Sequence, residues 1–144
     1  MESTKSATPG DAAIDGLIHG LIAGALMLVY LVVIGWIQAR PVTVVLGLFS
    51  PETGANPFYG AVAHLAVSSI YGAGFAMAFR KLRGNWWALA AGLGYGLLLI
   101  AIANFLLIPG YATALAAIEP LQMSIAHIVY GLVMGAMTKR GAGE

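Results

Sequence analysis

The sequence predicts an all-α integral membrane protein with four transmembrane helices, arranged as two tandem helical hairpins with both termini in the cytoplasm. Hydrophobic residues make up 60% of the 144 residues and charged residues only 9%, whereas soluble domains carry about 25% charged residues. Four apolar segments are each long enough to cross the ~30 Å hydrocarbon layer of a bilayer. In addition, one pattern of Pro, His and Gly occurs twice along the chain.

Four spans are expected inside one membrane domain that covers residues 14–140. Residues 1–13 are polar and small, and we expect them to form a flexible cytoplasmic tail, with residues 141–144 as a second tail. Trp86 and Trp87 mark an interface before the third span, because tryptophans concentrate at the membrane surface. The expected spans cover residues 14–38, residues 59–79, the segment from Trp87 to Ile108, and residues 121–137.

The orientation follows from basic residues near the ends of the spans. Six of them fall on one side of the four-span arrangement, whereas Arg40 alone falls on the other. Cytoplasmic loops carry the excess of Lys and Arg. Both termini are therefore expected in the cytoplasm, together with Lys5, Arg80, Lys81, Arg83, Lys139 and Arg140.

The repeated pattern predicts a duplicated hairpin. Pro57, His64 and Gly72 recur 63 residues later as Pro120, His127 and Gly135, and each Pro suits the first turn of a helix. Similarly, His19, Gly24 and Pro41 align with Trp87, Gly92 and Pro109, 68 residues later. The first repeat covers about residues 14–83 and the second about 84–140. Parallel repeats usually pack around a pseudo-twofold axis along the membrane normal.

Small residues at four-residue spacing occur on every span and predict close helix packing. In lipid, helices associate where small side chains let their backbones approach. Because one bundle is not expected to bury all of these positions, we expect some of them to contact a partner subunit. The expected packing positions are Gly16, Gly20, Gly24, Gly72, Ala76, Gly92, Gly96, Gly131 and Gly135.

The two outer connections, residues 41–49 and 110–118, are too apolar for ordinary aqueous loops. We expect each to lie at the membrane surface or to cover the outer mouth of the bundle, the second as a short helix. The alternative is that they contact a partner protein.

Helical spacing predicts a polar cluster inside the outer half of the bundle, made by His64, His127, Ser68 and Asn104. Three interpretations stay open. The cluster can be structural, with neutral side chains bonding one another. His64 and His127 can instead be axial ligands of a b-type haem, or the cluster can hold a quinone or a lipid headgroup. His19, one turn after Asp15, is expected to form an interfacial polar pair.

Catalytic chemistry has little support in the sequence, and we expect no enzyme activity. No carboxylate, Lys or Arg lies mid-span, which removes the usual relay of ion-coupled transporters. The absence of cysteine excludes disulfides and thiolate metal sites, and we expect no metal. A net charge of +1 gives no reason to expect nucleic-acid binding.

Two function classes follow. The first is a non-catalytic small membrane subunit, without a cofactor, that packs on and stabilises a larger complex. The chain resembles, in general class only, small multi-span bacterial membrane proteins and accessory subunits of respiratory or photosynthetic complexes. The complex is therefore expected to be an energy-transducing one in the bacterial inner membrane. The alternative is a small protein that holds a haem b or quinone between His64 and His127. An oligomeric transporter is the third candidate.

Overall fold

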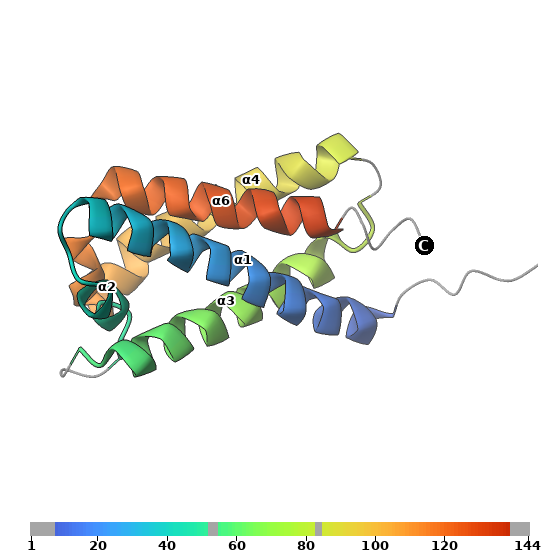
Figure 1. Cartoon of the computed structure of the whole chain (residues 1–144). Coiled ribbons are helices and arrows are strands. Elements are labelled where there is room, and N and C mark those ends of the chain that lie inside the picture. The colour runs from blue at the N-terminus through green and yellow to red at the C-terminus, as the bar shows by residue number, and fades with distance from the viewer. Residues whose placement is uncertain (1–7, 52–54, 83–84, 139–144) are drawn as a thin grey trace, which may run out of the picture.

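The computed structural model describes residues 8–51, 55–82 and 85–138, and every regular element in these ranges is helical. Figure 1 shows the long helices running side by side, with the short helix α2 at one end of the bundle. That end is called the α2 end below. The elements are α1 (Pro9–Ile37), α2 (Val42–Gly47), α3 (Pro57–Phe79), α4 (Asn85–Ile102), the π-helix η1 (Ala103–Leu107), α5 (Ile108–Gly110), the 3₁₀-helix η2 (Thr113–Ala117) and α6 (Pro120–Thr138).

Within the described residues, four helices are long and apolar enough to cross a membrane, as expected: Pro9–Ile37, Pro57–Phe79, Trp86–Gly110 and Pro120–Thr138. The first span begins at Pro9, several residues before the expected end of the flexible tail. A capping box explains this early start. The Thr8 hydroxyl accepts a hydrogen bond from the Asp11 backbone N–H, the Thr8 backbone N–H donates to the Asp11 carboxylate, and Pro9 occupies the first turn.

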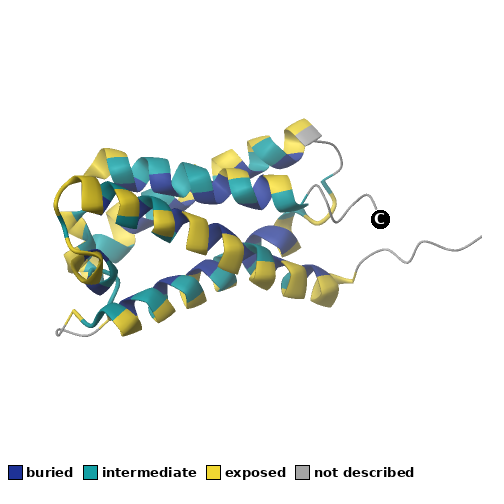
Figure 2. Cartoon of the chain, in the orientation of Figure 1, coloured by how far each residue is buried: buried dark blue, intermediate teal, exposed yellow. Residues whose placement is uncertain are grey.

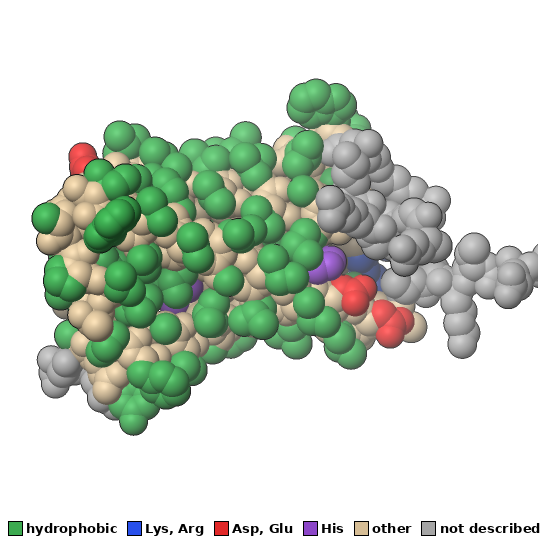
Figure 3. Space-filling model, viewed as in Figure 1, with side chains coloured by type: hydrophobic (Ala, Val, Ile, Leu, Met, Phe, Trp, Pro, Cys, Tyr) green, Lys and Arg blue, Asp and Glu red, His purple; other side chains and the backbone are tan. Residues whose placement is uncertain are grey.

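The lateral surface of the bundle is apolar. Only 22% to 33% of each spanning segment is buried inside the protein, and the exposed remainder carries mainly aliphatic and aromatic side chains. Figure 2 shows these exposed faces along every long helix, and Figure 3 shows hydrophobic side chains covering the visible side, with acidic groups toward the two ends. Such a surface matches the hydrocarbon of a bilayer.

Each antiparallel neighbour pair is held by close backbone contact at glycines. Helix α1 packs along α3, and α4 packs along α6. A Cβ atom added at Gly20 would overlap the carbonyl oxygen of Ser68, and one added at Gly92 would overlap the carbonyl oxygen of Gly131. The backbones therefore touch where the side chain is a hydrogen atom, as small-residue packing in lipid requires.

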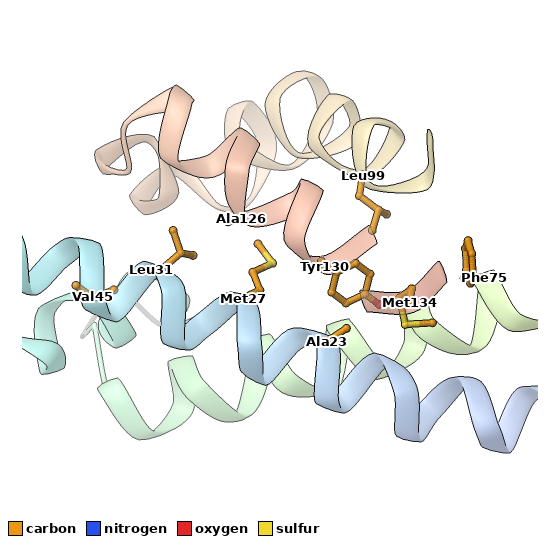
Figure 4. Packing of buried hydrophobic residues seen from close by; sticks show 9 residues of the cluster. All are labelled: Ala23, Met27, Leu31, Val45, Phe75, Leu99, Ala126, Tyr130 and Met134. Carbon is orange, nitrogen blue, oxygen red and sulfur yellow. The ribbon is translucent and has the colours of Figure 1, made fainter. Parts of the chain in front are cut away.

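Larger side chains fill the space between the α1–α3 pair and the α4–α6 pair. Helix α1 also packs on α6, whereas α3 and α4 approach each other less closely. Tyr130, Phe75 and Met134 are the largest fully buried side chains of the described residues. Figure 4 shows the central cluster, which is Ala23, Met27, Leu31, Val45, Phe75, Leu99, Ala126, Tyr130 and Met134.

Helix α2 folds back over the α2 end of the α1–α3 pair. The chain leaves α1 through Ala39 at φ 58°, where Arg40 N–H donates to Gly35 O and Ala39 N–H donates to Trp36 O. This pair of bonds is the Schellman arrangement that ends many helices. Val45 is buried, and α2 lies so close to α3 that a Cβ at Gly60 would overlap the backbone of Leu46.

The second connection differs from the first. It contains the short helices α5 and η2, which confirms the expected helical turn there, but its residues are mostly exposed. Before it, α4 passes into the π-helix η1. Pro109 explains the change, because proline has no N–H to donate and clashes with the carbonyl four residues earlier. A π-bulge relieves that clash inside a helix.

The glycine contacts make a sharp prediction about two neighbouring positions on α4. Gly92→Ala should lower the free energy of unfolding by about 1–3 kcal/mol, because the new methyl group meets the backbone of Gly131 and Gly135. Gly94→Ala should raise it by about 0.5–1 kcal/mol, because Gly94 is exposed with nothing within 4 Å and alanine favours the helix. Equilibrium unfolding of the purified protein in mixed micelles measures both. Equal effects of the two substitutions would contradict this packing.

Candidate functional site

His64 lies on α3, two turns after the start of the helix. Asn56 caps that start, since its side-chain oxygen accepts hydrogen bonds from Phe58 N–H and Tyr59 N–H. The His64 ring is 9% exposed, and its Nε2–H donates to the carbonyl oxygen of Gly24 on α1 across 3.1 Å. The ring of Phe49, from the segment after α2, meets it edge-on at 4.6 Å. His64 therefore joins α1 to α3 beneath the α2 end.

Ser68 lies one turn further along α3 and is also buried. Its side chain is packed against Gly24, so closely that a Cβ on Gly24 would overlap it. Its carbonyl oxygen accepts a hydrogen bond of 2.6 Å from the Tyr130 hydroxyl of α6. Ser68 and His64 were expected to lie together. Both side chains lie next to Gly24 of α1, on the side of α3 that faces α1.

His127 lies on α6 in a different setting. Its ring is only half-buried, and Nδ1–H donates to Met123 O of the same helix across 2.9 Å. No hydrogen bond of Nε2 is present within the described residues. The two histidines therefore occupy unequal environments, because His64 bonds to a neighbouring helix and His127 bonds to its own.

Asn104 does not join this cluster, and that part of the expected site is wrong. The residue is in η1 and is exposed, and its side-chain amide makes no hydrogen bond to the described residues. The π-helix changes the number of residues per turn, so spacing counted from Gly92 and Gly96 no longer gives the face of Asn104. Pro109, five residues downstream, was the sequence signal for this change.

Three tyrosines that the sequence reasoning missed hold the helices together. Besides Tyr130, Tyr95 of α4 donates its hydroxyl hydrogen to Tyr71 O of α3 across 2.8 Å. Tyr30 of α1 donates to the side-chain oxygen of Gln122 on α6. Among the described residues, no fully buried side-chain nitrogen or oxygen lacks a partner. The side-chain hydrogen bonds of His64 and of these three tyrosines thus join helices, whereas those of Ser69, His127 and Thr138 stay within one helix.

The expected packing residues all lie between paired helices. Gly16, Gly20 and Gly24 face Gly72, Ala76 and Ser68, while the small residues of α4 face those of α6. The expectation that some of these named positions would be left for a partner is therefore wrong, since each one is used within the chain. His19 and Asp15 also depart from expectation, because no hydrogen bond or ion pair joins them.

Two hollows lie away from the histidines. One is an open apolar groove of α1, α2 and α3, lined by residues that include Leu28, Val32 and Leu65. The other is a small hollow at the α2 end whose lining is mostly apolar but includes Arg40 and Gln122. Neither histidine lines either hollow. Within residues 8–51, 55–82 and 85–138, no three His, Asp or Glu side chains gather as a metal site would require.

Comparison with known proteins adds no assignment: family models, curated proteins and solved structures all gave no match.

Proposed function

We propose that this chain is a non-catalytic small integral membrane subunit that packs on and stabilises a larger membrane complex. The observation that carries the proposal is the exposed amide of Asn104 on the outward surface of α4 and η1, with no hydrogen bond to the described residues. An amide that faces hydrocarbon without a partner is costly. A polar side chain of a neighbouring transmembrane helix would satisfy it.

A second exposed part of α4, about three turns before Asn104, has small residues that allow close approach by another helix. Ala90 and Gly94 are four residues apart, and both are exposed. No atom lies within 4 Å of the position that a Gly94 Cβ would take, in contrast to the glycines of the paired faces. Glycine disfavours a helix by about 1 kcal/mol relative to alanine, and close contact with a partner helix would offset that cost.

The proposed setting is the bacterial inner membrane, and the proposed complex is an energy-transducing one, respiratory or photosynthetic. Support for this class comes from small size, an apolar lateral surface and internal polar groups that are used in packing. The general resemblance to accessory subunits of such complexes points the same way.

We also propose that the two hairpins arose by duplication. Gly24 meets Ser68, and their counterparts 68 and 63 residues later, Gly92 and Gly131, also meet. Pro57 and Pro120 both occupy the first turn of a helix, as the repeat requires. The contacts between hairpins are less regular, since α1 packs on α6 more closely than α3 packs on α4.

A haem or quinone protein is the second candidate function. The observation that favours it is the Nε2 of His127, which has no hydrogen bond to the described residues. Against a shared ligand stands the Nε2 of His64, which would have to release Gly24 O before it could bind anything.

The subunit proposal predicts that larger side chains at the exposed positions Gly94 and Asn104 weaken binding of a partner protein. The wild-type protein, extracted from its native membranes in mild detergent, should co-purify with at least one larger membrane protein in constant ratio. Gly94→Leu and Asn104→Leu should each reduce that recovery by roughly tenfold, as the loss of one good contact implies. Ala66→Leu, at an exposed position of α3, is the control and should leave recovery unchanged. A stable monomer without any partner from wild-type membranes would refute the proposal.

Topology is tested separately. Arg80 and Lys81 follow α3 at the end opposite Arg40, which favours a cytoplasmic position for that end. A fluorescent protein fused to the C-terminus should therefore fold and fluoresce in the cytoplasm, whereas a periplasmic phosphatase at the same place should be inactive. An active phosphatase would reverse the orientation.

The second candidate has a spectroscopic test. If the subunit proposal holds, the purified protein shows no Soret band, and His64→Phe lowers stability by about 1 kcal/mol through loss of the bond to Gly24. A Soret band in the wild type that disappears in both His64→Phe and His127→Phe would establish haem binding instead.

A further inference from the structure

The small hollow at the α2 end lies where α1 and α2 meet the start of α6. Its polar lining comes from Gln38 and Arg40, which follow α1, and from Glu119 and Gln122 at the start of α6. Its apolar walls come from α1, α2 and the residue before Glu119. The volume is about 20 Å³, which is space for one water-sized group.

Two opposite charges line this hollow without neutralising each other. The Arg40 guanidinium donates from Nη1 to the carbonyl oxygen of Ala117 across 2.8 Å, which holds it between the hairpins. A guanidinium has five N–H donors, and within the described residues this is its one hydrogen bond. No ion pair joins Arg40 to Glu119. Among the described residues, Arg40 thus has N–H donors left over and Glu119 has no ion-pair partner.

Gln122 contributes an oriented amide. Its side-chain oxygen accepts the hydrogen bond from the Tyr30 hydroxyl, which fixes the amide plane. The NH₂ group of Gln122 has no hydrogen bond within the described residues. The hollow thus offers donors from Arg40 and Gln122 and an acceptor from Glu119.

The depth of the hollow matches the headgroup layer of the membrane. Trp36 lies four residues before Arg40 and is 74% exposed, and Tyr111 on the neighbouring connection is 89% exposed. Exposed Trp and Tyr at the ends of spanning helices mark the interface between hydrocarbon and headgroups. Arg40 and Glu119 therefore lie beside phospholipid headgroups.

We propose that the polar residues at the mouth of this hollow bind the phosphoethanolamine headgroup of a membrane phospholipid. The phosphate accepts hydrogen bonds from Arg40 and Gln122, and the primary ammonium donates to the Glu119 carboxylate. The exposed Glu119 carboxylate accepts hydrogen bonds from the N–H groups of a primary ammonium, whereas the trimethylammonium of a choline headgroup has no N–H to donate. The exposed apolar side chains of Trp36 and Ile37 nearby favour a lipid over a free headgroup. This site is independent of the α4 surface proposed to bind a partner.

Native mass spectrometry of the full chain in detergent tests the lipid preference. Phosphatidylethanolamine, phosphatidylcholine and phosphatidylglycerol with identical acyl chains are added at equal concentration. Phosphatidylethanolamine should be retained about tenfold more than either of the others, as a charge-assisted hydrogen bond to the ammonium implies. Equal retention of the three lipids, or a preference for either of the others, would overturn the proposal. So would displacement by free phosphoethanolamine at the same concentration.

Two substitutions separate the roles of the charges. Glu119→Gln should lower retention of phosphatidylethanolamine to the level of phosphatidylcholine, while leaving retention of phosphatidylcholine nearly unchanged. Arg40→Gln should lower retention of both lipids, because it removes the phosphate donors. Lys81→Gln, at an exposed cation on the opposite end of the bundle, is the matched control and should behave as wild type. Glu119 is exposed, so its substitution tests the site even if Arg40→Gln fails to fold; an unchanged lipid preference in Glu119→Gln would refute the assignment.

Discussion

Close backbone contact at the glycines within the α1–α3 and α4–α6 pairs is the constraint on which the rest of the structure depends. Lipid supplies no hydrophobic force between helices, so association rests on packing and hydrogen bonds. Gly20 against Ser68 and Gly92 against Gly131 bring the backbones together where any Cβ would overlap. Because small residues are used within the pairs, the space between the pairs is filled by Tyr130, Phe75 and Met134. The helices are therefore closest within the α1–α3 and α4–α6 pairs, and large side chains separate the two pairs.

The polar groups follow from the same arrangement. Where helices lie close, a second donor can reach a carbonyl oxygen of the neighbouring helix, as His64 does at Gly24 and Tyr130 does at Ser68. Such bonds contribute about 0.6 kcal/mol each on average in membrane proteins. They therefore favour one arrangement of the helices over others, but supply little of the free energy of helix association. Polar groups with capacity left for ligands or partners then lie mainly at the surface, on η1 and at the α2 end.

Much of the fold could be predicted from the sequence, because apolar length and small-residue spacing are direct physical requirements of a bilayer. The four spans, the prolines in first turns and the paired glycine faces are all present. The prediction for Asn104 failed because it assumed a regular α-helix up to Pro109, where a π-helix intervenes. The tyrosine contacts were missed since they depend on the distance between helices, which no spacing within one helix gives. The duplicated hairpin stays a prediction.

The two histidines show how one motif gives different sites when the connections differ. The first connection folds back as α2, buries Val45 and places Phe49 against the His64 ring. The second is five residues shorter in the proposed alignment, and its 3₁₀-helix is exposed instead of covering α6. His127 is consequently half-buried and bonds to Met123 of its own helix. A symmetric ligand site between the histidines would need both rings in the same environment, and the two connections make those environments different.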